Sequence, residues 1–199
     1  MEGDAGSSVG AVAALLRQKL DFTNAFLGHD IQRPLDIEGA VADLAAGAVI
    51  GIATGRAEFG PRALGHRSLL CDPRGPDAKD RVNAIKLRES FRPFAPAVLD
   101  EHALEHFDMP MPSSPYMQYI AKVRRPDLFP AITHVDGTAR VQTVAQKDNP
   151  TLHALLSRFY NFTGCPMLLN TSLNIKGEPL ANTWEDAQRF SALHNVRIY

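Results

Sequence analysis

The sequence contains little cysteine, no long apolar run and almost no net charge. Cys71 and Cys165 are the two cysteines among 199 residues, which argues against a disulfide framework and favours buried, reduced thiols. No stretch approaches the ~18 to 20 consecutive apolar residues of a membrane span. The start MEGDAGSS is acidic and polar, unlike a signal peptide. We therefore expect a soluble protein of the cytoplasm.

The charge balance argues against nucleic acid or a lipid surface as the partner. Lysine and arginine number 21 and aspartate and glutamate 22, so the net charge is −1. Nothing draws the whole surface toward nucleic acid or anionic lipid, and any cationic site must be local. The sequence contains neither G-x-x-x-x-G-K-[ST] nor G-x-G-x-x-G. A bound nucleotide would therefore be held without either familiar phosphate loop.

Length and periodicity predict a single domain of mixed secondary structure. With 45% hydrophobic residues the chain can bury one substantial core. The patterns predict helices over 9–20, 37–45, 78–88, 100–107, 150–163 and from 184 on, and strands over 48–53, 68–72, 91–99, 116–123, 139–144 and 166–170. Two prolines make 91–99 an edge or irregular strand. The alternation of elements predicts an α/β or α+β fold around a mixed sheet.

The segment GRAEFGPRALGHRS, residues 55–68, concentrates positive charge on a backbone that we expect to consist of turns. A buried guanidinium without a partner is very costly. Glu58 and Asp72 are candidate partners, and a bound anion is the other candidate, because arginine forks match phosphate or carboxylate oxygens. Three arginines on an exposed, mobile loop remain the simpler alternative. The three are Arg56, Arg62 and Arg67.

Three further segments add polar groups that suit an anionic ligand. NAIKLRESFRPFAP contains Lys86 and also Arg92, which lies between aromatic residues and prolines that would strengthen its attraction to an anion. HVDGTARVQ places polar side chains just before a predicted strand. LLNTSLN ends an apolar strand in Asn170 and Ser172, and strand ends of α/β sheets are common ligand sites.

The stretch HALEH, from His102 to His106, matches the H-x-x-E-H pattern of zinc proteases. Two histidines four residues apart share one helix face. A zinc site also needs a further ligand from elsewhere, so two solvated histidines on a surface helix are the favoured interpretation.

The segments GRAEFGPRALGHRSLLCDPR, NAIKLRESFRPFAP, THVDGTARVQ and TGCPMLLNTSLNIKGEPL together resemble the successive signature segments of one family. The family is the C-terminal domain of O-carbamoyltransferases, of the nodulation and antibiotic-tailoring type. The likeness runs from about Ile37 to Phe190. It implies a fold similar to YrdC/Sua5, a twisted mixed sheet flanked by helices. It also implies that residues 36–199 form this domain and that 1–35 are an N-terminal extension with a helix.

The resemblance implies a transferase that binds ATP and carbamoyl phosphate and makes carbamoyl adenylate. Mg²⁺ is compatible with ATP, although no cluster in the sequence marks a dedicated metal site. By position in the matching motifs, Arg62, Lys86 and Arg92 would be catalytic. Substrate or nucleotide contacts would come from seven further residues: Arg56, Glu58, His66, His134, Arg140, Asn170 and Ser172.

Members of this family also carry a larger N-terminal domain, similar to Kae1 and metal-binding, which transfers the carbamoyl group to an acceptor hydroxyl. This sequence has no counterpart of it, so we expect a partner domain or subunit to supply that step. The sequence stops at HNVRIY, where the family adds a last strand, and we expect a truncated C-terminus. Two other functions remain open: a non-catalytic partner in a split carbamoyltransferase, and an RNA-associated module of the YrdC type.

Overall fold

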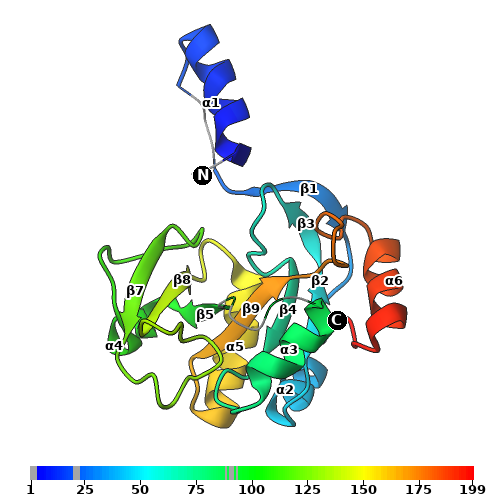
Figure 1. Cartoon of the computed structure of the whole chain (residues 1–199). Coiled ribbons are helices and arrows are strands. Elements are labelled where there is room, and N and C mark those ends of the chain that lie inside the picture. Colours follow the sequence, from blue (N-terminus) through cyan, green and yellow to red (C-terminus); the bar gives the residue numbers. More distant parts are fainter. Residues whose placement is uncertain (1–3, 20–22, 88, 90–91, 93) are drawn as a thin grey trace.

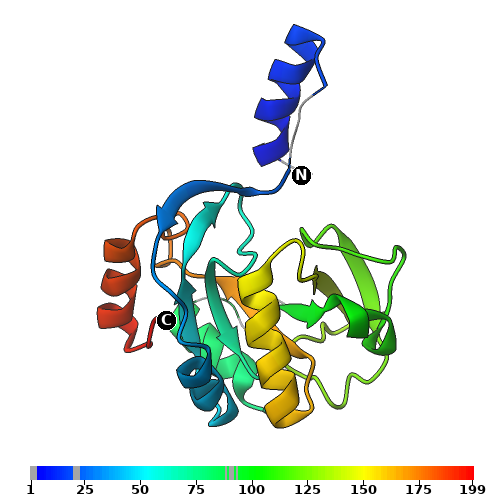
Figure 2. The same cartoon turned by 180° about the vertical axis from the view of Figure 1, so that it is seen from behind.

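The fold is described from a computed structural model, which describes residues 4–19, 23–87, 89, 92 and 94–199. The first helix, α1 (Asp4–Leu16), stands away from the body of the molecule, which is a sheet with helices on both faces (Figures 1 and 2). None of the helices within these residues combines the length and the apolar character needed to cross a membrane.

The main sheet is mixed, as the sequence predicts. Its seven strands in the described chain all pair antiparallel except β5 with β8, which are parallel. In spatial order they are β2 (Ile50–Ala53), β4 (Arg67–Cys71), β9 (Met167–Ser172), β5 (Ala95–Leu99), β8 (Thr138–Val144), β7 (Tyr119–Val123) and β6 (Phe107–Asp108). A separate antiparallel pair joins β1 (Phe26–Ile31) to β3 (Gly55–Glu58). Strands β4 and β5 are buried along their whole length, because helices cover the sheet on both faces.

Helices α2 (Ile37–Ala45) and α5 (Pro150–Thr163) pack together on one face of the sheet (Figure 2). Helix α3 (Ala78–Lys86) lies on the opposite face (Figure 1). Helix α6 (Trp184–His194) contacts β2, and two short helices, η1 (Asp100–His102) and α4 (Ala103–His106), follow β5.

Side-chain caps fix where three of these helices begin. The Asp36 carboxylate accepts from the Gly39 N–H, and the Asn149 amide oxygen accepts from the Leu152 N–H. Thr183 and Asp186 form a reciprocal capping box. Each cap satisfies backbone N–H groups that the first turn of a helix leaves unpaired.

Three sequence expectations need correction. Strand β5 is an interior strand, between β9 and β8, and not an edge strand. It accommodates Pro96 because pairing with β8 begins one residue later, at Ala97; residues 91 and 93 of the expected strand lie outside the described chain. The segment 55–68 is not all turn, since β3 and the first residues of β4 belong to it. Helix α1 ends at Leu16, and the predicted end at Leu20 lies outside the described residues.

Arg67 at the start of β4 is fully buried and satisfied by the backbone alone. Its guanidinium makes six hydrogen bonds of 2.8 to 3.4 Å, all to carbonyl oxygens. The acceptors belong to β1, to the β2–β3 junction, to its own neighbour and to the loop before α6: His29, Thr54, Gly55, His66 and Asn182. Arg67 is therefore a structural cross-link between segments that are distant in sequence.

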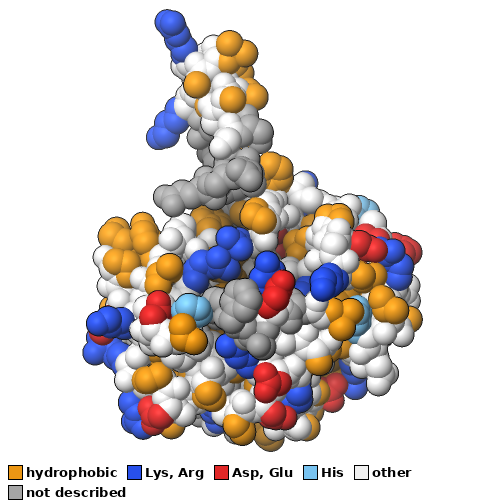
Figure 3. Space-filling model, in the orientation of Figure 1, with side chains coloured by type: hydrophobic (Ala, Val, Ile, Leu, Met, Phe, Trp, Pro, Cys, Tyr) orange, Lys and Arg blue, Asp and Glu red, His pale blue; other side chains and the backbone are white. Residues whose placement is uncertain are grey.

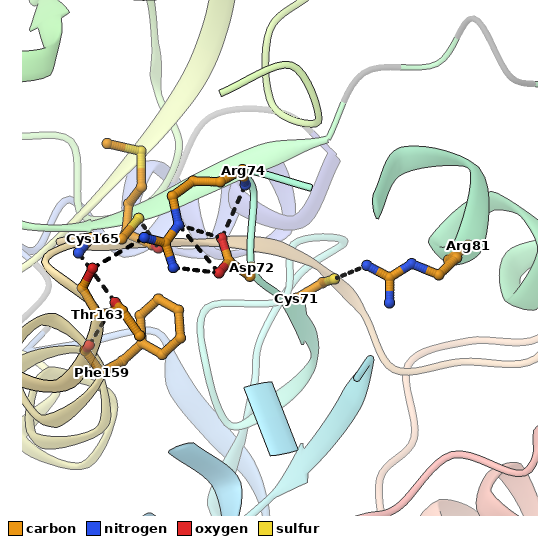
Figure 4. Close-up of polar contacts among 8 residues, drawn as sticks. Cys71, Asp72, Arg74, Arg81, Phe159, Thr163 and Cys165 are labelled. Atoms are coloured by element: carbon orange, nitrogen blue, oxygen red, sulfur yellow. Dashed lines mark hydrogen bonds and ion pairs between the residues drawn. The ribbon is translucent and has the colours of Figure 1, made fainter. Parts of the chain in front are cut away.

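The two cysteines are free and buried, as predicted (Figure 4). Burial raises the pKa of each thiol to about 11, so both stay protonated near neutral pH. Close to Cys165, Arg74 forms a bidentate pair with Asp72 and donates to the Thr163 carbonyl at 3.1 Å (Figure 4). This pair ties the end of β4 to the end of α5.

We predict that Arg67→Ala is strongly destabilising, because it leaves several buried carbonyls without a donor at roughly 1–3 kcal/mol each. Urea unfolding should show a loss of about 3 kcal/mol or more in the free energy of unfolding. The matched control is Arg158→Ala, which removes an exposed ion pair with Glu38 and should have little effect. Equal losses for the two variants would contradict the structural role of Arg67.

Candidate functional site

A pocket opens on the sheet where the loop after β3 crosses β5, β8 and β9. It is lined by Pro61, Arg62, Ala63, Phe94, Ala95, Met117, Arg140, Asn170, Thr171 and Ser172. Ala95 is paired with Asn170 on β9, and the register with β8 places Ala95 level with Arg140. The small Ala95 side chain thus leaves space between an amide and a guanidinium. Figure 3 shows several Lys and Arg side chains near the middle of the face that Figure 1 presents.

Arg62 and Arg140 bring two cations to this pocket without a carboxylate. Neither arginine takes part in any ion pair among the described residues, although eight other arginines do. The Arg140 Nε is buried and has no hydrogen-bond partner there. Burial lowers the pKa of Arg140, and the nearby Arg62 cation lowers it further. Two adjacent cations without a counter-ion are unfavourable, so the arrangement suits an anionic ligand.

Glu58 anchors the loop that carries Arg62. Its Oε1 accepts from the N–H groups of Leu64 at 2.7 Å, His66 at 2.8 Å and Arg67 at 3.2 Å. Oε1 of Glu58 is therefore occupied by the backbone, whereas Oε2 is buried without a partner among the described residues, and Glu58 forms no ion pair with the nearby arginines there. Asp72, the other expected partner, pairs with Arg74.

Gly65 lets the same loop approach helix α5. Its φ of +115° favours glycine, and a Cβ atom at this position would lie 2.5 Å from Cδ2 of Leu152. A larger residue would push the loop off the helix.

Three buried amides hold the loop from below. Asn170 donates from Nδ2 to the Ala63 carbonyl at 3.1 Å and to Gln142 Oε1 at 2.7 Å. Gln142 Nε2 and Asn149 Nδ2 both donate to the Leu64 carbonyl, at 2.9 and 3.1 Å. The amide oxygen of Asn170 is buried and has no partner among the described residues. Gln142 and Asn149 were not predicted as site residues, because no motif marks two amides that meet only in the folded chain.

Arg56 and His66 support β1 and do not line the pocket. Arg56 donates to the carbonyls of Leu27 and Gly28. The His66 ring stacks on Phe26, with 4.0 Å between centroids, and its Nδ1 lies 2.7 Å from the Arg56 carbonyl. Both side chains fasten β1 to the arginine-rich segment.

Lys86, at the end of α3, contacts the pocket wall from outside. Its ammonium donates to the carbonyls of Ser172 and Asn174, at 2.7 and 2.9 Å, and lies 3.4 Å from the Ser172 hydroxyl. Lys86 thus stabilises the turn after β9, and Ser172 faces the pocket between that turn and Asn170.

Two other predicted site residues are not among the residues that line this pocket. Arg92 is exposed and pairs with Glu89 at 3.2 Å; its neighbours 91 and 93, which we expected to form apolar walls, lie outside the described residues. His134 pairs with Asp136 at 3.2 Å in the turn before β8.

The HALEH stretch does not form a metal site in the described part of the chain, where no group of three or more His, Cys, Asp or Glu residues is placed to hold a metal ion. The histidines are also not simply solvated. The His102 ring packs against Tyr160, and the His106 ring meets Phe129 edge-on at 5.4 Å. Both rings therefore serve packing, and burial lowers the pKa of His106.

The chain is similar to known proteins in sequence and in fold. The family model described as "Carbamoyltransferase C-terminus" matches residues 41–199. The nodulation protein NolO of Bradyrhizobium diazoefficiens is 51% identical over 171 residues, which cover 82% of this chain and 31% of that protein. A 3'-hydroxymethylcephem-O-carbamoyltransferase of Amycolatopsis lactamdurans is 46% identical, over 77% of this chain and 29% of that protein. The chain thus spans about a third of the length of these relatives.

Two solved structures share the fold at low sequence identity. Full-length HypF, in a phosphate- and nucleotide-bound form, matches 84% of this chain and 21% of its own with a TM-score of 0.61 and 18% identity. Sua5 of P. abyssi, complexed with L-threonine, matches 85% of this chain and 49% of its own with a TM-score of 0.60 and 14% identity. These neighbours confirm the predicted YrdC-like fold. On the family match and the identity to its relatives, the chain belongs to the carbamoyltransferase C-terminal domain family.

Proposed function

We propose that the pocket binds carbamoyl phosphate and that the chain uses ATP to form carbamoyl adenylate. The observation that carries the proposal is that, among the described residues, one pocket contains both unpaired cations and an unpaired hydrogen-bond acceptor. Arg62 and Arg140 supply cations that have no counter-ion in the described chain, and Asn170 supplies a buried acceptor without a donor. Carbamoyl phosphate offers both missing partners, a phosphate dianion and an N–H donor.

The two arginines fit the phosphate end of this ligand. Guanidinium forks bind phosphate oxygens with two parallel hydrogen bonds, and they do so most strongly where solvent is partly excluded. The Arg140 Nε is buried at this position. A bound phosphate would therefore relieve the mutual repulsion of Arg62 and Arg140 while gaining charge-assisted hydrogen bonds.

Asn170 fits the carbamoyl end. Both hydrogens of its Nδ2 are already used, by the Ala63 carbonyl and by Gln142. The oxygen is the group that remains to contact a ligand, and it can only accept. A carbamoyl NH₂ satisfies it, whereas the methyl group of acetyl phosphate leaves it unpaired.

In the proposed reaction, water hydrolyses carbamoyl phosphate to carbamate and inorganic phosphate, and a carbamate oxygen then attacks the α-phosphorus of ATP. The new P–O bond forms as the bond to the β-phosphate breaks and pyrophosphate leaves. Such a step needs alignment and neutralised charge more than it needs a base. Arg62 and Arg140 would provide this charge, and Lys86 keeps a further positive charge behind Ser172.

Arg92 would also contact a phosphate group, as its position in the family-like segment NAIKLRESFRPFAP implies. Its exposed pair with Glu89 is weak enough for a phosphate to displace. No cluster of acidic residues in the described chain suits Mg²⁺, so Mg²⁺ would arrive with ATP, held by its phosphates. The structure of full-length HypF, which shares this fold, is of a phosphate- and nucleotide-bound form, and this supports the choice of ligands.

The acceptor half of the reaction would belong to a Kae1-like domain or subunit. The relatives continue for about two thirds of their length beyond the part that this chain matches. We place the protein in the cytoplasm, where its two unpaired thiols stay reduced.

Isothermal titration of the chain with carbamoyl phosphate and then with ATP, followed by an assay for pyrophosphate, tests the proposal. We expect the chain to bind both ligands and to release pyrophosphate. Arg62→Ala should weaken carbamoyl phosphate binding about tenfold or more, as loss of a charge-assisted hydrogen bond does. The control is Arg189→Ala on α6, which removes the ion pair between Arg189 and Glu178. This variant should bind the ligands as the wild type does. If the wild type binds neither ligand, the proposal is wrong, and binding without pyrophosphate points to the non-catalytic partner.

A second prediction concerns stability without ligand. Arg140→Met should raise the free energy of unfolding by about 1 kcal/mol in phosphate-free buffer, because it removes a partly buried, uncompensated charge. The same variant should lose the thermal stabilisation that phosphate gives the wild type. Thermal and urea unfolding with and without phosphate would measure both effects. A destabilised Arg140→Met variant that still responds to phosphate would show that Arg140 is not part of an anion site.

A further inference from the structure

A directional relay of hydrogen bonds runs from the loop backbone to the pocket through two side-chain amides. The Leu64 carbonyl accepts from Gln142 Nε2 at 2.9 Å, and Gln142 Oε1 accepts from Asn170 Nδ2 at 2.7 Å. The Ala63 carbonyl also accepts from Asn170 Nδ2, at 3.1 Å. Gln142 is 2% exposed and Asn170 1%, so water does not replace these contacts.

The orientation of both amides in this relay is fixed, because backbone carbonyls can only accept hydrogen bonds. Turning the Gln142 amide over would set its oxygen against the Leu64 carbonyl. Turning the Asn170 amide over would set its oxygen against both the Ala63 carbonyl and Gln142 Oε1. Each reversal replaces hydrogen bonds with contacts between acceptors in a buried site, which is costly. The loop backbone therefore decides which end of the Asn170 amide remains unpaired.

We propose that Gln142 is a positioning residue that sets the ligand selectivity of the pocket through Asn170. By accepting from Nδ2, it holds the Asn170 amide so that the oxygen is left for the ligand. The pocket then selects an acyl phosphate whose acyl group carries N–H, and it rejects one that carries a methyl group. This inference rests on the proposed function, but it concerns a residue that does not line the pocket.

Comparison of carbamoyl phosphate, acetyl phosphate and inorganic phosphate tests the inference, since the first two differ mainly by NH₂ against CH₃. By titration calorimetry the wild type should prefer carbamoyl over acetyl phosphate about tenfold, the value of one buried hydrogen bond lost with its acceptor left unpaired. In Gln142→Leu, Asn170 loses one of its two fixed acceptors and its amide can turn. The preference should fall to about twofold or less, while inorganic phosphate binds within about twofold of the wild type.

Two further variants separate the relay from general damage to the loop. In Gln142→Glu one oxygen still accepts from Asn170 Nδ2, while the other loses the bond to the Leu64 carbonyl and adds negative charge. Binding of all three phosphates should therefore weaken, but the preference should survive. Asn149→Asp is the matched control. It loses the other donor to the Leu64 carbonyl but keeps the oxygen that caps α5, and it should keep the wild-type preference.

The outcomes distinguish this inference from the proposed function. If the wild type prefers carbamoyl phosphate and Gln142→Leu keeps the full preference, Gln142 does not set it, and the proposed function stands. If Asn149→Asp and Gln142→Glu lose the preference as Gln142→Leu does, loop position controls selectivity and the relay is wrong. If the wild type binds none of the phosphates, both proposals fail.

Discussion

The arrangement of the pocket depends on one carboxylate oxygen. Glu58 Oε1 accepts from three backbone N–H groups within residues 64–67, and a carboxylate that accepts several N–H bonds is a strong organiser of a loop. These bonds close the chain between the end of β3 and the start of β4 into a compact turn. Arg62 lies inside that turn, so the backbone that carries its side chain into the pocket is held in place. The amides beneath the loop act on the same residues from the opposite side.

The three arginines of the segment 55–68 have two different kinds of surroundings. Arg67 is saturated by carbonyl oxygens and fixes the fold, and Arg56 fastens β1 through two further carbonyls. Arg62 forms no ion pair within the described residues, and it lines the same pocket as Arg140. Two cations held close together cost some stability, as is common where function and stability compete.

The sequence predicted the family and the type of fold, and it located most helices, because caps and apolar periodicity are local signals. The predicted helices over 37–45, over 150–163 and from 184 on begin where the structure places side-chain caps, at Asp36, Asn149 and Thr183. The sequence shows that the segment 55–68 contains three arginines, but it does not show which of them is structural and which lines the pocket. Arg67 is bound by backbone carbonyl groups, and every residue has such a group, so no residue type in the sequence marks this role. The interior place of β5 was missed for a related reason, since strand order is set by tertiary pairing and Pro96 suggested an edge.

The last residues of the chain have a further consequence for the outer side of β2. Residues 197–199 run parallel to that strand, and three backbone hydrogen bonds of 2.8 to 3.0 Å join Gly51 and Ala53 to Arg197 and Tyr199. The Tyr199 hydroxyl donates to Asp43 on α2 and locks the segment in place. An open strand edge is a template on which other chains can assemble. Residues 197–199 thus cover backbone groups of β2 that would otherwise be open to pairing with another chain.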